Sequence, residues 1–200
     1  FVRNVAEYQK HSWVNGGDDG VKGRPWGYRM MCRFFSGVMQ NREEIKKYDY
    51  YIRLDHDSFF IDPKAGKSIE KFISETDFDY SFRSVFTDNK EKDALWNFTK
   101  KYLLANGMYK EKVQKMRDLG FLDEQMNYNG TCPYNNYHVC KVSFWQRPDV
   151  KKFTDAIEKE HGIVRYHWQD ANIHAIIVGL FVERDKLLLR TDFGDLFKSK

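Results

Sequence analysis

The chain has 200 residues, of which 42% are hydrophobic and 16% aromatic, so it is long enough for one sizeable core and short for two. Its net charge is +4, but both signs are mixed along the chain, which favours a small anionic ligand over nucleic acid. No apolar run reaches the length of a membrane span. We therefore expect a single domain over residues 1–200, with no nucleic-acid partner and no membrane span in this chain.

The predicted elements alternate between helices and strands. The glycine-rich residues 14–25 predict a loop, and a helix over 28–39, a charged segment at 41–47 and a strand over 50–54 follow. Next come a helix over 68–75, a strand over 80–86 and helices over 90–107 and 110–119. A loop over 127–137, a strand over 141–145 and helices over 148–160 and 170–178 complete the pattern. This alternation predicts an α/β fold, in which ligands bind beyond the carboxyl ends of strands.

Two carboxylates end the predicted strand over 50–54. Asp55 and Asp57 are two residues apart, so in an extended chain their side chains leave on one face, roughly 6.5 to 7 Å apart. Hard oxygen ligands in this arrangement suit Mn²⁺ or Mg²⁺, which leave coordination positions for the phosphate oxygens of a substrate. A strand-end turn without a metal is an equal alternative. We interpret the same spacing in Asp77-Phe78-Asp79 as a solvated turn, because it follows a helix.

A second candidate pair lies at the start of the last predicted helix. Asp170 and His174 are four residues apart and share one helical face. Neutral His174 could supply a nitrogen ligand, and Asp170 could orient a substrate hydroxyl or take part in proton transfer. The alternative is a capping Asp and a partly buried His with one hydrogen bond.

Three blocks of the chain carry a distinctive pattern in a fixed order. They are Tyr28-Arg29-Met30-Met31-Cys32-Arg33-Phe34-Phe35-Ser36-Gly37, Tyr50-Tyr51-Ile52-Arg53-Leu54-Asp55-His56-Asp57, and Trp168-Gln169-Asp170-Ala171-Asn172-Ile173-His174-Ala175 followed by Gly179-Leu180-Phe181. Together they resemble the fungal α-1,2-mannosyltransferases of the Kre2/Mnt1 type, which have the GT-A fold.

The resemblance implies a GT-A-like (Rossmann-like) mixed central sheet flanked by helices. It also implies a metal site and a donor site. Asp55 and His174 would bind Mn²⁺, with Asp57 added by the Asp-x-Asp of this chain. Tyr28 and Arg33 would border the donor site, and Asp170 would lie close to the sugars.

The chain departs from the family pattern at three places. His138 stands where the family has its proposed catalytic Glu, which leaves the stereochemistry open. Asp55-His56 replaces the family's Glu-Pro, so the donor preference could differ from GDP-mannose. The chain also begins after the family's opening strand, which leaves the base open and implies that Phe1 need not be the native start.

Our hypothesis from the sequence is metal-dependent transfer of a sugar from a UDP- or GDP-linked donor to a hydroxyl of a glycan or glycoprotein. Arg33 and Arg53 are candidate partners of the donor phosphates, because a guanidinium can engage two oxygens at once. An exposed, ion-paired Arg53 is an equal alternative. Trp168 is a candidate to stack on a sugar ring.

Proton removal from the acceptor would fall to Asp170 if the anomeric centre inverts, or to the departing phosphate if it is retained. Glu124 and His138 are further candidates for the catalytic group. A metal-dependent phosphohydrolase or nuclease would also use paired carboxylates and a His. A non-catalytic carbohydrate-binding domain would need the aromatic residues alone.

The cysteines and the N-glycosylation triplets bear on the cellular compartment of the protein. Cys32, Cys132 and Cys140 form neither an even disulfide framework nor a Cys-x-x-Cys motif, which slightly favours the cytoplasm. The glycosylation triplets Asn97-Phe98-Thr99 and Asn129-Gly130-Thr131 keep a lumenal location open. If an anchor precedes Phe1, the Golgi lumen is the expected location.

Overall fold

A four-stranded mixed sheet forms the centre of the computed structural model, which describes residues 26–55, 58–60, 65–190 and 197–199. The strand order is β1-β6-β3-β7. Both β1 and β3 pair antiparallel to β6, whereas β7 runs parallel to β3. This order places residues near 53 directly beside residues near 138. The four strands are β1 (Tyr50–Leu54), β3 (Tyr80–Phe82), β6 (Tyr137–Lys141) and β7 (Leu187–Leu189).

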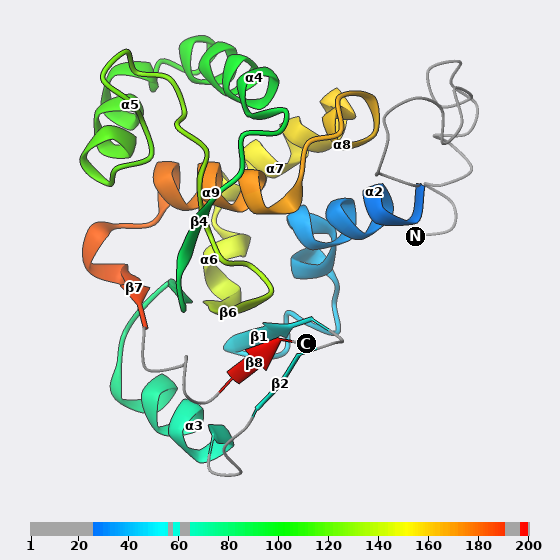
Figure 1. Ribbon diagram of the computed structural model, residues 1–200, viewed down its shortest axis with the longest axis vertical. Helices are drawn as coiled ribbons and strands as arrows, with labels where there is room; N and C mark the ends of the chain where they lie inside the picture. Colours follow the sequence, from blue (N-terminus) through cyan, green and yellow to red (C-terminus); the bar gives the residue numbers. More distant parts are fainter. Residues whose placement is uncertain (1–25, 56–57, 61–64, 191–196, 200) are drawn as a thin grey trace.

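Helices cover both faces of this sheet (Figure 1). Successive strand residues point to opposite faces, and in β6 Val139 packs with Ile69 and Phe72 of α3, whereas Cys140 belongs to the larger core around α9. The expected α/β arrangement, a mixed sheet flanked by helices, is confirmed. The two covering helices are α3 (Ala65–Glu75) and α9 (Asp170–Phe181).

Every residue of α9 is buried. A helix that is apolar nearly all round needs cover on all sides, and three further helices together with the sheet supply that cover. These three are α4 (Lys92–Ala105), α5 (Tyr109–Asp118) and α7 (Pro148–Glu160), and the shorter helical segments are α6 (Val142–Gln146), α8 (Gly162–Arg165) and η3 (Arg184–Lys186).

Two small antiparallel pairs lie outside the central sheet. The predicted strand over 80–86 is in fact two strands, because the chain leaves the central sheet after Phe82 and pairs elsewhere from Val85. The small pairs are β4 (Val85–Thr87) with β5 (Thr131–Pro133), and β2 (Ser58–Phe60) with β8 (Phe197–Ser199).

The helix predicted over 28–39 is interrupted. It consists of α2 (Trp26–Arg33), a π-helical turn η1 (Phe34–Val38) and a 3₁₀ turn η2 (Met39–Asn41). Gly37 has φ 130°, and a Cβ there would lie 3.2 Å from the Thr154 side chain. Close contact with α7 therefore favours glycine at the kink.

The prediction of a strand over 141–145 was wrong. The strand β6 ends at Lys141, and residues 142–146 form α6, whose Val142, Phe144 and Trp145 are buried. Residues 137–140 are all buried although His138 is polar, so β6 lacks the alternation that marks a half-exposed strand. The predicted loop over 127–137 likewise contains β5.

The prediction of a solvated turn at Asp77-Phe78-Asp79 holds for Asp77 alone, since the Asp79 side chain is only 19% exposed. The Asp77 side chain is 65% exposed and forms ion pairs with Lys141 and Lys186. Phe78 is completely buried against α3, since its ring stacks on Phe72 with a centroid distance of 4.7 Å. The second Asp-x-Asp pattern therefore serves the packing of the chain between α3 and β3.

Candidate functional site

The carboxyl end of β1 presents Asp55 next to a buried arginine. The Asp55 side chain is 36% exposed, and its backbone N–H donates to the carbonyl of Asn136, 3.1 Å away. Strand alternation turns Tyr51 and Arg53 toward α9, whereas Ile52 between them is exposed. Arg53 Nη2 lies 3.3 Å from Asp55 Oδ1.

The same guanidinium reaches the first turn of α9. Arg53 Nη1 donates to Asp170 Oδ2 at 2.6 Å, and Asn135 Nδ2 donates to the same oxygen at 2.8 Å. Asp170 Oδ1 accepts a weaker hydrogen bond from Cys32 Sγ at 3.4 Å. The amino terminus of a helix also favours a carboxylate. The structure thus brings Asp55 and Asp170 together through one arginine.

Arg53 is held on its flat side as well. Its guanidinium carbon lies 3.9 Å from the centre of the Phe35 ring, and the residue is 6% exposed. Burial lowers the pKa of Arg53, but the adjacent Asp170 carboxylate more than offsets this and raises it above its usual value. Arg53 is therefore ion-paired, as the alternative stated, but it is buried rather than exposed. Its assignment as a phosphate partner stays a prediction.

His174 lies fully buried beneath this ion pair. Its Nε2 is 2.8 Å from the Phe35 carbonyl, which can only accept, so Nε2 carries the proton. In the neutral ring Nδ1 then accepts from the Tyr80 hydroxyl at 3.0 Å. Burial lowers the pKa of His174 to about 4. Both nitrogens are thus occupied by the protein itself.

His138 repeats this pattern on β6. Its Nδ1 donates to the carbonyl of Asn135 and its Nε2 accepts from the Tyr51 hydroxyl, each at 3.2 Å. The two histidine rings are 5.2 Å apart, and burial holds the pKa of His138 well below its usual range. His138 is a cross-strand partner of Arg53 but is 1% exposed. Its assignment to catalysis stays a prediction, and its position in this structure is that of a core residue.

The described residues contain no group of three His, Cys, Asp or Glu side chains that could hold a metal ion. Asp55 supplies one hard oxygen ligand at the surface, and Asp57 lies outside the described residues. His174 offers no free nitrogen lone pair in this arrangement. Among the described residues only Asp55 offers an accessible carboxylate, which by itself does not make a metal site. The Asp55, Asp57 and His174 set stays a prediction.

Tyr28 forms a hydrogen bond with the residue that precedes Asp170. Its hydroxyl donates to Gln169 Oε1 at 3.0 Å, and Gln169 directly precedes Asp170. Gln169 also donates to Asp88 Oδ2 at 2.5 Å. Tyr28 thus joins α2 to the segment that carries Asp170, and its place beside the donor site stays a prediction.

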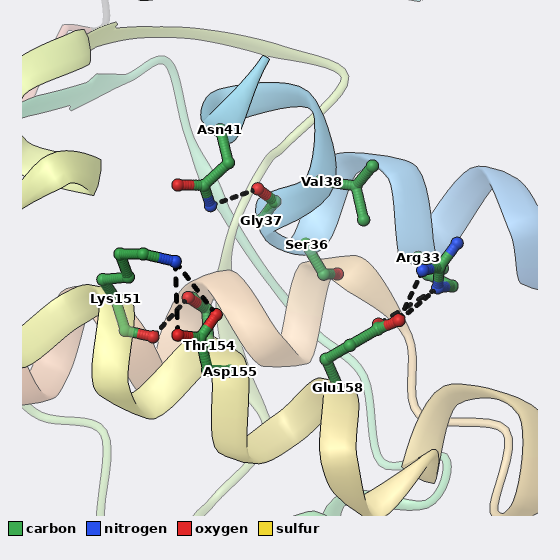
Figure 2. Close-up of a pocket in the computed structure, with 9 residues that line it drawn as sticks. All are labelled: Arg33, Ser36, Gly37, Val38, Asn41, Lys151, Thr154, Asp155 and Glu158. Atoms are coloured by element: carbon green, nitrogen blue, oxygen red, sulfur yellow. Dashed lines mark hydrogen bonds and ion pairs between the residues drawn. The ribbon is translucent and has the colours of Figure 1, made fainter. Parts of the chain in front are cut away.

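Arg33 is directed to a different place. It forms an ion pair with Glu158 of α7, and both line a cavity of about 270 Å³ between α2 and α7 (Figure 2). The Arg33 side chain is 2% exposed. The structure therefore does not group Arg33 with Asp55, and its donor-binding assignment stays a prediction.

Trp168 and Glu124 complete the predicted set. Trp168 is 2% exposed and packs on Gly162, where a Cβ would lie 2.1 Å from its ring. Glu124 is exposed in the turn between Leu122 and Tyr128, away from the residues that contact Arg53. The structure does not join either residue to the Asp55 and Asp170 cluster.

Sequence reasoning missed three members of this cluster. Asn135 lies in a stretch whose composition indicates only a loop, Phe35 reads as a core residue, and Tyr80 lies on another strand. No spacing in the sequence links them to Asp170 or His174, since their contacts arise from the packing of the sheet against α9.

Comparison with known proteins identifies the family. A family model described as glycolipid 2-alpha-mannosyltransferase matches residues 19–199. The chain belongs to this family. A glycolipid 2-alpha-mannosyltransferase of Candida albicans is 30% identical over 176 residues, covering 87% of this chain and 40% of that protein. An O-glycoside alpha-1,2-mannosyltransferase of Schizosaccharomyces pombe is 30% identical over 171 residues, covering 84% and 43%.

Solved mannosyltransferases share the fold with this family member. Core-mannan synthase A of Aspergillus fumigatus, solved in a Mn/GDP form, matches with a TM-score of 0.68 at 22% identity, covering 98% of this chain and 51% of that one. A Saccharomyces cerevisiae mannosyltransferase in complex with GDP gives 0.64 at 18% identity, covering 99% and 50%. The expected GT-A-like fold is confirmed. The chain spans about 40% of the length of the curated relatives that it matches.

No helix among the described residues is long and apolar enough to cross a membrane. The slight preference for the cytoplasm that we drew from the cysteines receives no support from the relatives. All three cysteines are free and buried.

Proposed function

We propose that this chain forms part of a metal-dependent mannosyltransferase that moves mannose from GDP-mannose to a hydroxyl of a glycan. The observation that carries the proposal is the match of the mannosyltransferase family model to residues 19–199. Two solved relatives hold GDP, and one of them holds Mn as well, which favours a GDP-linked over a UDP-linked donor and Mn²⁺ as the ion.

Asp55 would hold the ion, because it is the half-exposed carboxylate at the end of β1. Asp57 is its predicted companion, and His174 could join only after releasing Tyr80 or Phe35. Bound Mn²⁺ would offset the negative charge of the diphosphate. Arg53 keeps Asp55 in place by a hydrogen bond from behind, so the carboxylate is already oriented when ligand arrives.

Asp170 acts in this proposal as a positioning residue. Its carboxylate is 4% exposed and accepts hydrogen bonds from Arg53 and Asn135, so it fixes the arginine that in turn fixes Asp55. Both buried histidines stay neutral near pH 7, because burial lowers the pKa of each. They provide an uncharged support beneath the ion pair.

Calorimetry on the intact protein that carries this chain tests the proposal. GDP and GDP-mannose should bind in the presence of Mn²⁺ and lose most of their affinity in EDTA. Asp55→Asn should weaken Mn²⁺-dependent GDP binding at least about tenfold. Asp77→Asn is the matched control, because Asp77 has the same Asp-x-Asp spacing in an exposed turn and should bind GDP normally. Metal-independent binding of GDP, or none, would refute the proposal.

A further inference from the structure

A second cavity lies between α4 and the loop that joins α8 to α9. Figure 1 shows where these elements lie in the fold. Its volume is about 240 Å³. This is below the roughly 300 to 1,000 Å³ of sites for drug-sized ligands, so it suits one ring better than a nucleotide. The residues that give it its chemistry are Asn97, Phe98, Lys101, Glu160, Tyr166 and Trp168.

Three aromatic rings make one wall of this cavity. The Phe98 and Tyr166 rings lie 5.1 and 5.6 Å from the ring of Trp168, inclined at 47° and 39°. Trp168 is seated on Gly162, where no side chain would fit. The wall is therefore fixed before any ligand arrives, which lowers the entropy cost of binding.

The backbone of the loop supports the same wall. His167 has φ 59°, a left-handed conformation that is uncommon for a residue with a side chain. The next residue but one, Gln169, is held by Tyr28 and Asp88. The residues on both sides of Trp168 therefore restrict its backbone: His167 by its left-handed conformation, and Gln169 by its two hydrogen bonds.

Polar groups surround the aromatic wall. Asn97 and Lys101 are exposed on α4, and Glu160 accepts a hydrogen bond from the Tyr166 hydroxyl at 3.2 Å. The indole N–H of Trp168 is buried and has no hydrogen-bond partner in the part of the chain that the structure describes. Glu160 already forms an ion pair with Arg165, 3.7 Å away, and Lys101 is exposed to solvent, so neither lining charge needs a charged ligand.

We propose that this cavity binds one pyranose ring of a neutral glycan. The apolar face of a sugar ring would stack on the partly exposed Phe98 and Tyr166, which Trp168 supports from inside the core, and its hydroxyls would both donate to and accept from the polar rim. Trp168 and Asp170 are two residues apart, so their Cα atoms are at most about 7 Å from each other. The cavity therefore shares a segment with the proposed donor site. Resting on the proposed function, we assign it to an outer sugar of the acceptor.

The test measures binding of mannotriose to the intact protein, produced in a host that adds no N-glycan at Asn97, without nucleotide or metal. Tyr166→Ala removes part of the wall, and Asn97→Trp fills the mouth from the surface without disturbing the core. Each should weaken mannotriose binding at least about fivefold and raise the KM for the acceptor equally, with kcat and GDP affinity unchanged. Tyr48→Ala, which removes a 65% exposed tyrosine outside the cavity, should change neither. Circular dichroism checks that each variant is folded.

The outcomes separate this inference from the proposed function. Metal-dependent GDP binding with mannotriose affinity unchanged in both variants overturns the inference and leaves the proposed function intact. Mannotriose binding that the variants abolish, in a protein that does not bind GDP, supports the sugar site and overturns its assignment to the acceptor.

Discussion

The ion pair between Arg53 and Asp170 should be the most sensitive point of the proposed site. Arg53→Met removes the arginine but retains most of its length. The Asp170 carboxylate, which is 4% exposed, then stays buried and keeps hydrogen bonds from Asn135 and Cys32 among the described residues. Breaking a buried pair from one side typically costs about 3 to 5 kcal/mol. In a chain of 200 residues each kcal/mol corresponds to roughly 2 to 4 °C. We expect the melting temperature to fall by about 6 to 20 °C.

Urea unfolding followed by circular dichroism measures this loss. The double variant Arg53→Met/Asp170→Asn should recover at least about half of it, because the buried charge is then gone as well. Arg42→Met is the matched control: its pair with Glu44 has side chains 47% and 67% exposed, so at most about 1 kcal/mol should be lost. If Arg53→Met costs no more than Arg42→Met, or the double variant loses the sum of the single losses, the reasoning is refuted.

Three further predictions follow from burial and close packing. His174 has a folded pKa of about 4 against an ordinary 6.5, so the unfolded chain binds the proton first; stability should fall as pH drops from about 6.5 toward 4, by on the order of 3 kcal/mol. Unfolding in urea at pH 7 and pH 5 should show about 2 kcal/mol of this loss, and equal stabilities would contradict the prediction. Gly162→Ala should lower the free energy of unfolding by roughly 1 to 3 kcal/mol, because the added Cβ would overlap Trp168. Gly27→Ala is the control, because it adds a Cβ at an open helical position and should be neutral or stabilising. Equal melting temperatures of the two variants would contradict the close packing of Gly162 on Trp168. The three cysteines should resist a thiol reagent in the native protein and all react in urea, because each thiol is buried and burial raises its pKa. Rapid labelling of these thiols in the native protein would contradict the prediction.

Local pattern predicted much of the secondary structure. The helix at 148–160 was predicted over the same residues as α7, and the strand at 50–54 over the same residues as β1, because each has a clear period and a proline or polar residue at its boundary. The strand β6 was missed because it is buried on both faces and carries a histidine inside. An inward polar residue breaks the alternation on which strand prediction depends.

The sequence by itself determined the family and the α/β class. It also predicted that a carboxylate at the end of a strand, Asp55, and one at the start of a helix, Asp170, belong to one site. These predictions rest on local spacing and on the order of the three sequence blocks. Only the tertiary structure decided how those carboxylates meet. Asp55 and Asp170 are joined by Arg53, whereas His174 and His138 are occupied by Tyr80, Phe35, Tyr51 and Asn135. The reason is physical: a buried polar group must find a hydrogen-bond partner. For Asp170 with Arg53, His174 with Tyr80 and Phe35, and His138 with Tyr51, that partner is more than 80 positions away, so strand order and helix packing decide which one it is.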